Sequence, residues 1–175
     1  DCRTAGRPPI PEPVMAVSET IVREFFELHG FFVRQQRKHI APKREDDEID
    51  FYVHNPYGPP EGGEVPFVLE STEDILCLLR AVVVVKAWHT EVFTQAVLAN
   101  APEMFRFAGP ETFARATEAF GGPGPLTKVL VVPALPSGTE ARKQSIEVLQ
   151  AKGIDSVIAF RTMLADLINH IEVNR

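Results

Sequence analysis

Three charged residues stand at positions where the surrounding sequence is apolar. Lys86 directly follows four consecutive valines, a run that is typical of a strand buried on both faces of a sheet. Asp50 stands inside the alternating stretch EIDFYVHN, and Glu19 falls on an apolar stripe at helical spacing. A charge in such surroundings must be paired, neutralised or exposed to water, so each of the three is a candidate functional residue.

These residue types together could bind a metal ion and act on a phosphate group. Two carboxylates can supply oxygen ligands to a hard cation such as Mg²⁺. A nearby ammonium can orient water or offset the charge that develops on the phosphate. Asp50, Glu19 and Lys86 are therefore the catalytic candidates, provided that the fold brings them to one edge of a sheet.

The periodicity of apolar residues predicts the helices and strands that must position these side chains. Helices are expected over residues 14–29, 72–79, 110–121, 139–152 and 161–173, and strands over residues 31–38, 48–55, 81–86, 127–135 and 155–160. Short helical pieces are expected between residues 94 and 106. Because the valine strand needs helices above and below it, we expect a three-layer α/β fold with the strand of Asp50 beside the valine strand.

The order of these motifs resembles that of a nuclease superfamily. The stretches SETIVREFFELHGFFVRQQRK, DEIDFYVHNP and VVVVKAWH follow one another as the helix acid, the hairpin aspartate and the strand lysine do in the PD-(D/E)xK nucleases. The resemblance covers residues 18–132 and implies the restriction-endonuclease-like fold, a three-layer mixed sheet flanked by helices. It also implies a Mg²⁺-dependent endonuclease or phosphodiesterase acting on DNA, in which Asp50 binds the metal, Lys86 positions water and Glu19 supports the metal shell.

One position departs from the pattern of the superfamily. Val84 stands two residues before Lys86, where the nucleases have an acid. The missing metal ligand could come from Glu70 or Glu91, and the protein would then be a metal-dependent nuclease. Without either of them the site is degenerate, and the alternative is a non-enzymatic module of the same fold that binds nucleic acid or another protein. An unrelated flavodoxin-like binding domain is a third interpretation.

A basic segment joins the two strands that precede the valine strand. Its lysines and arginines are candidates for contact with a phosphate backbone: Arg34, Arg37, Lys38, Lys43 and Arg44. Four acids follow directly at residues 45–48, and the whole chain has a net charge of −6, so the overall field does not attract nucleic acid. DNA is therefore an expected partner only through a local patch.

The remaining features of the chain set its organisation. Residues 1–13 are rich in proline without apolar periodicity and are expected to be disordered, and residues 14–175 are expected to form a single domain. No apolar run approaches the roughly 18 residues that a membrane-spanning helix needs, and no signal-peptide pattern is visible. With only two cysteines in the chain, we expect a cytoplasmic protein. The sequence leaves open whether the protein forms a homodimer.

Overall fold

A five-stranded mixed sheet forms the centre of the computed structural model, which describes residues 17–36, 49–86 and 92–174. The strands are β1 (Phe32–Gln35), β2 (Phe51–His54), β3 (Arg80–Val85), β4 (Thr127–Val132) and β5 (Ser156–Ala159). They lie side by side in sequence order. The pairs β1–β2 and β2–β3 are antiparallel, and the pairs β3–β4 and β4–β5 are parallel. The prediction that the valine strand is central is confirmed. The strand predicted over residues 48–55, which carries Asp50, is its neighbour as expected, although its regular part begins only at Phe51.

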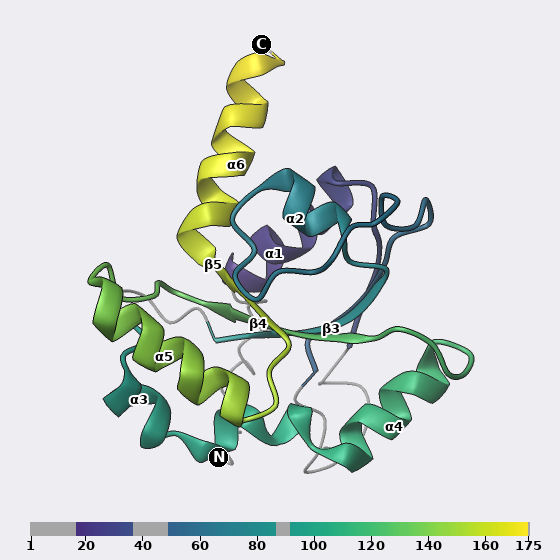
Figure 1. Ribbon diagram of the computed structural model, residues 1–175. Helices are drawn as coiled ribbons and strands as arrows, with labels where there is room; N and C mark the ends of the chain where they lie inside the picture. The colour runs from purple at the N-terminus through teal and green to yellow at the C-terminus, as the bar shows by residue number, and fades with distance from the viewer. Residues whose placement is uncertain (1–16, 37–48, 87–91, 175) are drawn as a thin grey trace, which may run out of the picture.

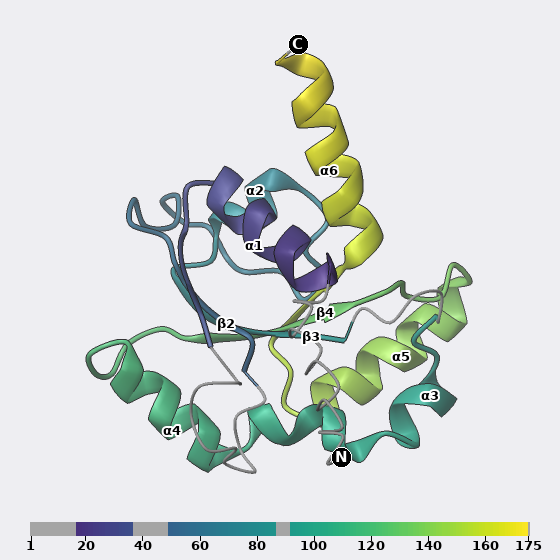
Figure 2. The same cartoon turned by 180° about the vertical axis from the view of Figure 1, so that it is seen from behind.

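Helices cover both faces of this sheet. In Figure 1, α1 (Val17–Leu28), α2 (Thr72–Leu76) and α6 (Phe160–Val173) lie above the sheet, and α3 (Gln95–Ala99), α4 (Pro110–Ala119) and α5 (Thr139–Ala151) lie below it. A 3₁₀ helix, η1 (Pro102–Ala108), connects α3 to α4, and Figure 2 shows the same layers from behind. The expected three-layer α/β fold is confirmed. The antiparallel strands β1 and β2 exclude the flavodoxin-like alternative, because that fold is built on a parallel doubly-wound sheet.

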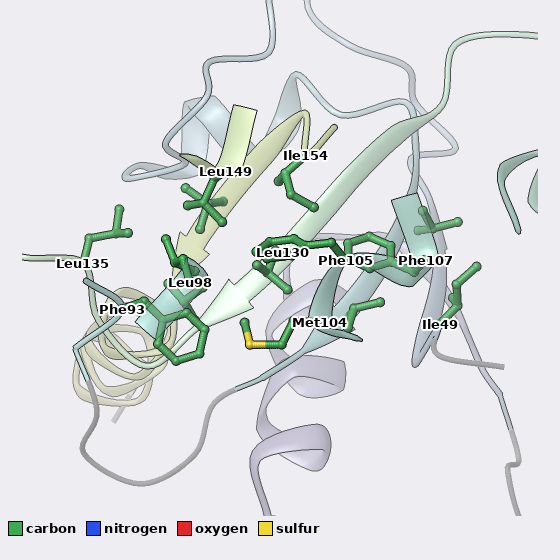
Figure 3. Packing of buried hydrophobic residues seen from close by; sticks show 14 of the residues in the cluster. Ile49, Phe93, Leu98, Met104, Phe105, Phe107, Leu130, Leu135, Leu149 and Ile154 are labelled. Atoms are coloured by element: carbon green, nitrogen blue, oxygen red, sulfur yellow. The ribbon is translucent and has the colours of Figure 1, made fainter. Parts of the chain in front are cut away.

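The valine strand packs against both helix layers. Val83 belongs to an apolar cluster between the sheet and α1 and α6, here called the upper cluster. Val82 and Val84 belong to the lower cluster, on the side of α3, α4 and α5. Figure 3 shows the lower cluster, where Leu130 of β4 is surrounded by side chains from η1, α3 and α5. Full burial of such a side chain is worth about 1.5–3 kcal/mol, so the run of valines is accounted for by the core alone.

Helix α1 is oriented by its apolar stripe. Val22, Phe25 and Phe26 are buried in the upper cluster, at the spacing of one helix face. The helix is followed by Gly30, which adopts a φ of 82° that favours glycine, and the chain then turns directly into β1. This turn places the first strand against the helix that precedes it.

The described part of the chain does not cover every sequence-based expectation. The segment predicted to be disordered, residues 1–13, lies outside the described residues. Helix α2 is shorter than expected, because residues 77–79 already lead into β3. Among the described helices, none combines the length and the apolar character that crossing a bilayer would require.

Candidate functional site at the ends of β2 and β3

Asp50 lies at the start of β2, where the regular pairing with β3 is interrupted. Phe51 is the partner of Val83 in the register, yet the backbone N–H of Asp50 also donates to the Val83 carbonyl, at 3.0 Å. Two residues of one strand thus face one residue of the other, which is the arrangement of a β-bulge. The packing agrees, because Ile49 and Tyr52 both lie in the lower cluster although they are three residues apart. A bulge redirects a side chain, and here the redirected residue is Asp50.

The carboxylate of Asp50 is buried and bound to the neighbouring strand. The residue is only 4% exposed, and its Oδ2 atom accepts a hydrogen bond from the backbone N–H of Val85 at 2.6 Å. Hydrogen bonds to an ionised carboxylate are shorter and stronger than those between neutral groups. One oxygen of the predicted metal ligand therefore has a structural role at the end of β3.

Lys86 follows Val85 and continues the sheet with its backbone. Its N–H donates to the Val131 carbonyl of β4 at 2.9 Å, and its side chain is half-buried. Because the N–H of the preceding residue, Val85, is bound to Asp50, β3 is held beside the Asp50 carboxylate one residue before Lys86. The structure thus brings Asp50 and Lys86 to the same end of the sheet.

Glu19 approaches the same end from the helix layer above. It lies in the first turn of α1, and its Oε2 atom accepts a hydrogen bond from Nε2 of Gln35 at 3.2 Å. The next residue, Gln36, donates its backbone N–H to the carbonyl of Asp50 at 2.9 Å. Glu19 is therefore connected to Asp50 through two consecutive residues at the end of β1, Gln35 and Gln36.

Glu70, a candidate for the missing ligand, lies elsewhere. The segment that contains it pairs with the outer side of β5, through a bridge between Val68 and Val157. Strands β4 and β5 thus separate Glu70 from β3 by about three strand spacings, roughly 14 Å. Its carboxylate forms an ion pair with Arg142 of α5 instead. The structure therefore does not bring Glu70 to Asp50. The sequence could not reveal this, because the bridge to β5 joins segments that are far apart in the chain.

The described residues do not fit a magnesium shell at this end of the sheet. Val84 is fully buried in the lower cluster and offers no oxygen ligand. Among the residues that the structure describes, no three His, Cys, Asp or Glu side chains are grouped so that they could hold a metal ion. Glu91 lies outside the described residues. Since hard cations need several oxygen ligands, Asp50 would need a further acid from beyond the described ranges.

One residue of the basic segment is described. Arg34 is exposed on β1, and its guanidinium carbon lies 4.7 Å from the centroid of the Tyr52 ring. The other basic candidates, Arg37, Lys38, Lys43 and Arg44, lie outside the described residues. Of the described cations, Arg34 thus belongs to the predicted DNA-binding segment and Lys86 to the predicted catalytic site.

A second polar cluster, which no sequence motif predicts, lies beside α6. The ring of His29 contacts the Phe25 carbonyl through Nδ1 at 2.7 Å and the Oδ2 atom of Asp166 through Nε2 at 3.2 Å. The Thr72 hydroxyl lies 3.5 Å from the same Nε2 atom, beside an open groove of about 520 Å³. In a catalytic triad the acid and the hydroxyl contact opposite nitrogens of the histidine ring, whereas here both contact Nε2. The cluster is therefore not a catalytic triad, and its contacts connect the end of α1 to α6.

Comparisons of the chain with protein-family models, with curated proteins and with solved structures gave no match.

Proposed function

We propose that this protein binds DNA at the sheet end formed by Asp50 and Lys86, and that it is a nuclease-like protein whose cleavage site is degenerate. The observation that supports this best is the hydrogen bond between the Asp50 carboxylate and the backbone N–H of Val85, the residue before Lys86. The resemblance to the PD-(D/E)xK nucleases implies a hairpin acid, a strand lysine and a helix acid. We propose that these are Asp50, Lys86 after β3, and Glu19 of α1, which contacts Gln35 of β1.

The degenerate character follows from the position of Val84. A valine that is completely buried in an apolar cluster cannot be exchanged for a metal-binding carboxylate without placing a charge in the core. One oxygen of Asp50 is already bound to Val85. A magnesium ion at Asp50 would therefore depend on Glu91, and we propose that it binds too weakly to support efficient cleavage.

The affinity for DNA is proposed to come from lysine and arginine side chains and not from a bound metal ion. Lys86 stands at the proposed site, and Arg34 begins the basic segment that leads to β2. Lysine and arginine gain affinity for a phosphate backbone by releasing its condensed counterions. A local patch of this kind can bind DNA even though the chain as a whole has a net charge of −6.

The second candidate function is protein binding on the same fold. The acidic net charge favours it, because the summed field of the protein repels a polyanion. The two functions differ in their response to salt, since only phosphate binding by several cations weakens steeply and linearly with the logarithm of the salt concentration.

The test combines a cleavage assay with a binding assay on the same DNA. Wild type, Asp50→Asn and Lys86→Ala are incubated with labelled duplex and branched DNA in Mg²⁺ or Mn²⁺, and Lys143→Ala, an exposed lysine of α5, serves as the matched control. We expect intact DNA in every reaction and weaker binding for Lys86→Ala alone. Cleavage by wild type that Asp50→Asn abolishes would overturn the degenerate assignment. The absence of any DNA binding at low salt would overturn the proposal as a whole.

A further inference from the structure

Cations and aromatic rings alternate on the lower face of the sheet at β1, β2 and β3. This set, here called the cation–aromatic cluster, consists of the strand residues Phe32, Arg34, Tyr52, His54 and Arg80 and of Phe120, which directly follows α4. Phe32 is the register partner of His54, which is in turn the partner of Arg80, and Arg34 is the partner of Tyr52. Directly opposed residues of antiparallel strands share a face, and Tyr52 packs in the lower cluster, so these strand residues face the lower side.

The members of the cluster are in contact with one another. The Arg34 guanidinium lies 4.7 Å from the centroid of the Tyr52 ring, and the rings of Tyr52 and Phe120 meet edge to face at 5.6 Å. The Arg80 guanidinium lies 5.4 Å from the Phe120 ring. At the edge strand, the rings of Phe32 and His54 are 6.5 Å apart. Arg34, Tyr52, Phe120 and Arg80 thus form one row of contacts, and Phe32 and His54 form a pair beside it at the edge of the sheet.

Packing accounts for the inner part of this row but not for its outer part. The guanidinium of Arg80 donates hydrogen bonds to the carbonyls of Phe120, Gly122 and Pro125, and so holds the loop that follows α4. Phe32 is different, because 68% of its surface is exposed on the edge strand. The Phe32 ring therefore has a face that the core does not cover, and Arg34, two residues further along β1, is exposed as well.

We infer that the outer part of the cation–aromatic cluster binds unpaired bases of DNA, with one base stacked on Phe32 and a phosphate near Arg34. Aromatic side chains stack on any base, and an adjacent guanidinium complements the charge of the backbone. Strands β1 and β2, with the sequences FVRQ and FYVH, contain no carboxylate that would repel the phosphates. The inference rests on the proposed function and names its substrate class, which is DNA with a single-stranded part.

The position of Phe32 relative to the proposed site agrees with this. Phe32 and Gln36 lie four residues apart along β1, which corresponds to roughly 13 Å in an extended chain. Gln36 donates its backbone N–H to the carbonyl of Asp50. A single strand that follows β1 would therefore lead from Phe32 to the sheet end at which Asp50 and Lys86 lie.

The experiment measures the fluorescence anisotropy of labelled oligothymidylate and of a blunt duplex of the same length, at low salt and in EDTA. We expect wild type to bind the single strand more tightly than the duplex. Phe32→Ala is expected to weaken binding of the single strand by roughly 5- to 150-fold, the range for loss of one base–aromatic stack. Phe32→Tyr keeps the ring and is expected to bind like wild type. Tyr57→Ala, which removes a ring that is 88% exposed outside the strands, is the matched control and is expected to bind like wild type.

Each other outcome has a definite meaning. Wild-type affinity in Phe32→Ala, or a preference for the duplex, would overturn the stacking surface and leave the proposed DNA binding in place. Wild-type affinity in Phe32→Leu would overturn it as well, because an apolar side chain without a π-face would then suffice, as it does in contacts between proteins. No binding of either DNA by wild type would overturn the proposed function together with this inference.

Discussion

The Oδ2 atom of Asp50 and the backbone nitrogen of Val85 lie 2.6 Å apart, so the predicted catalytic aspartate is also a hydrogen-bond partner of the central strand. Asp50→Ala is expected to lower the free energy of unfolding by about 1–3 kcal/mol, because the Val85 N–H loses its acceptor. Asp50→Asn keeps an acceptor oxygen and is expected to lose less. Urea denaturation followed by circular dichroism measures both, and an Asp50→Ala protein as stable as wild type would contradict the structural role.

Val84→Glu restores the acid of the nuclease pattern, and from the sequence it is expected to restore some metal binding. Its position in the structure predicts a different result. Val84 is fully buried, and an uncompensated charge there is expected to destabilise the fold by about 3–5 kcal/mol. Val85→Glu, at the half-buried neighbouring valine, is the matched control and is expected to cost less. Thermal unfolding with and without Mn²⁺ measures the difference, and a stable Val84→Glu protein that binds Mn²⁺ would contradict this prediction.

Much of the fold could be predicted from the sequence because the elements have clear periodicities. The four valines required two helix layers, and the alternation in EIDFYVHN predicted a strand beside them. The bulge at Asp50 could not be predicted, because it depends on which residues of β3 lie opposite. The position of Glu70 and the contact between His29 and Asp166 could not be predicted either. Both depend on contacts between segments that are far apart in the chain.

Ser71 and Asp74 form a capping box at the start of α2, in which each side chain accepts a hydrogen bond from the backbone N–H of the other residue. This capping box makes the stability of the protein depend on pH in the acidic range. Burial raises the pKa of Asp74, but hydrogen bonds from the backbone N–H groups of Glu70 and Ser71 and from the Ser71 side chain outweigh it, and the net pKa lies below its ordinary value. The carboxylate therefore adds stability above its unfolded-state pKa of about 3.9, and this stability is lost as the pH falls through the lower folded-state pKa.

Asp74→Asn tests this dependence. At neutral pH it is expected to lower the free energy of unfolding by about 0.5–1 kcal/mol, as loss of a capping contact does. Below the folded-state pKa the variant and wild type should be equally stable, because the wild-type carboxyl is then protonated as well. Glu73→Gln changes the neighbouring acid of the same turn and serves as the control. A stability difference that persists unchanged into strong acid would contradict the role of the Asp74 charge.

The contact between His29 and Asp166 is expected to fix α6 to the body of the protein. The His29 side chain is 7% exposed, and its Nε2 atom lies 3.2 Å from the Asp166 carboxylate. Asp166→Ala should lower the free energy of unfolding by about 1–3 kcal/mol, because a buried polar ring loses a partner. Amide hydrogen exchange should become faster in α6, whereas Glu172→Ala, on the exposed final turn, should leave it unchanged. Wild-type exchange rates in Asp166→Ala would contradict the assignment.

The salt dependence of DNA binding tests the central claim most directly. The anisotropy of a labelled duplex with a single-stranded extension is measured in EDTA over a series of salt concentrations, for wild type and for Lys86→Ala. We predict binding at low salt, a linear fall of the logarithm of the affinity with the logarithm of the salt concentration, and a slope that is smaller by about 1 in Lys86→Ala, for the loss of one phosphate contact. Binding that is absent at low salt or indifferent to salt would contradict DNA binding at this end of the sheet.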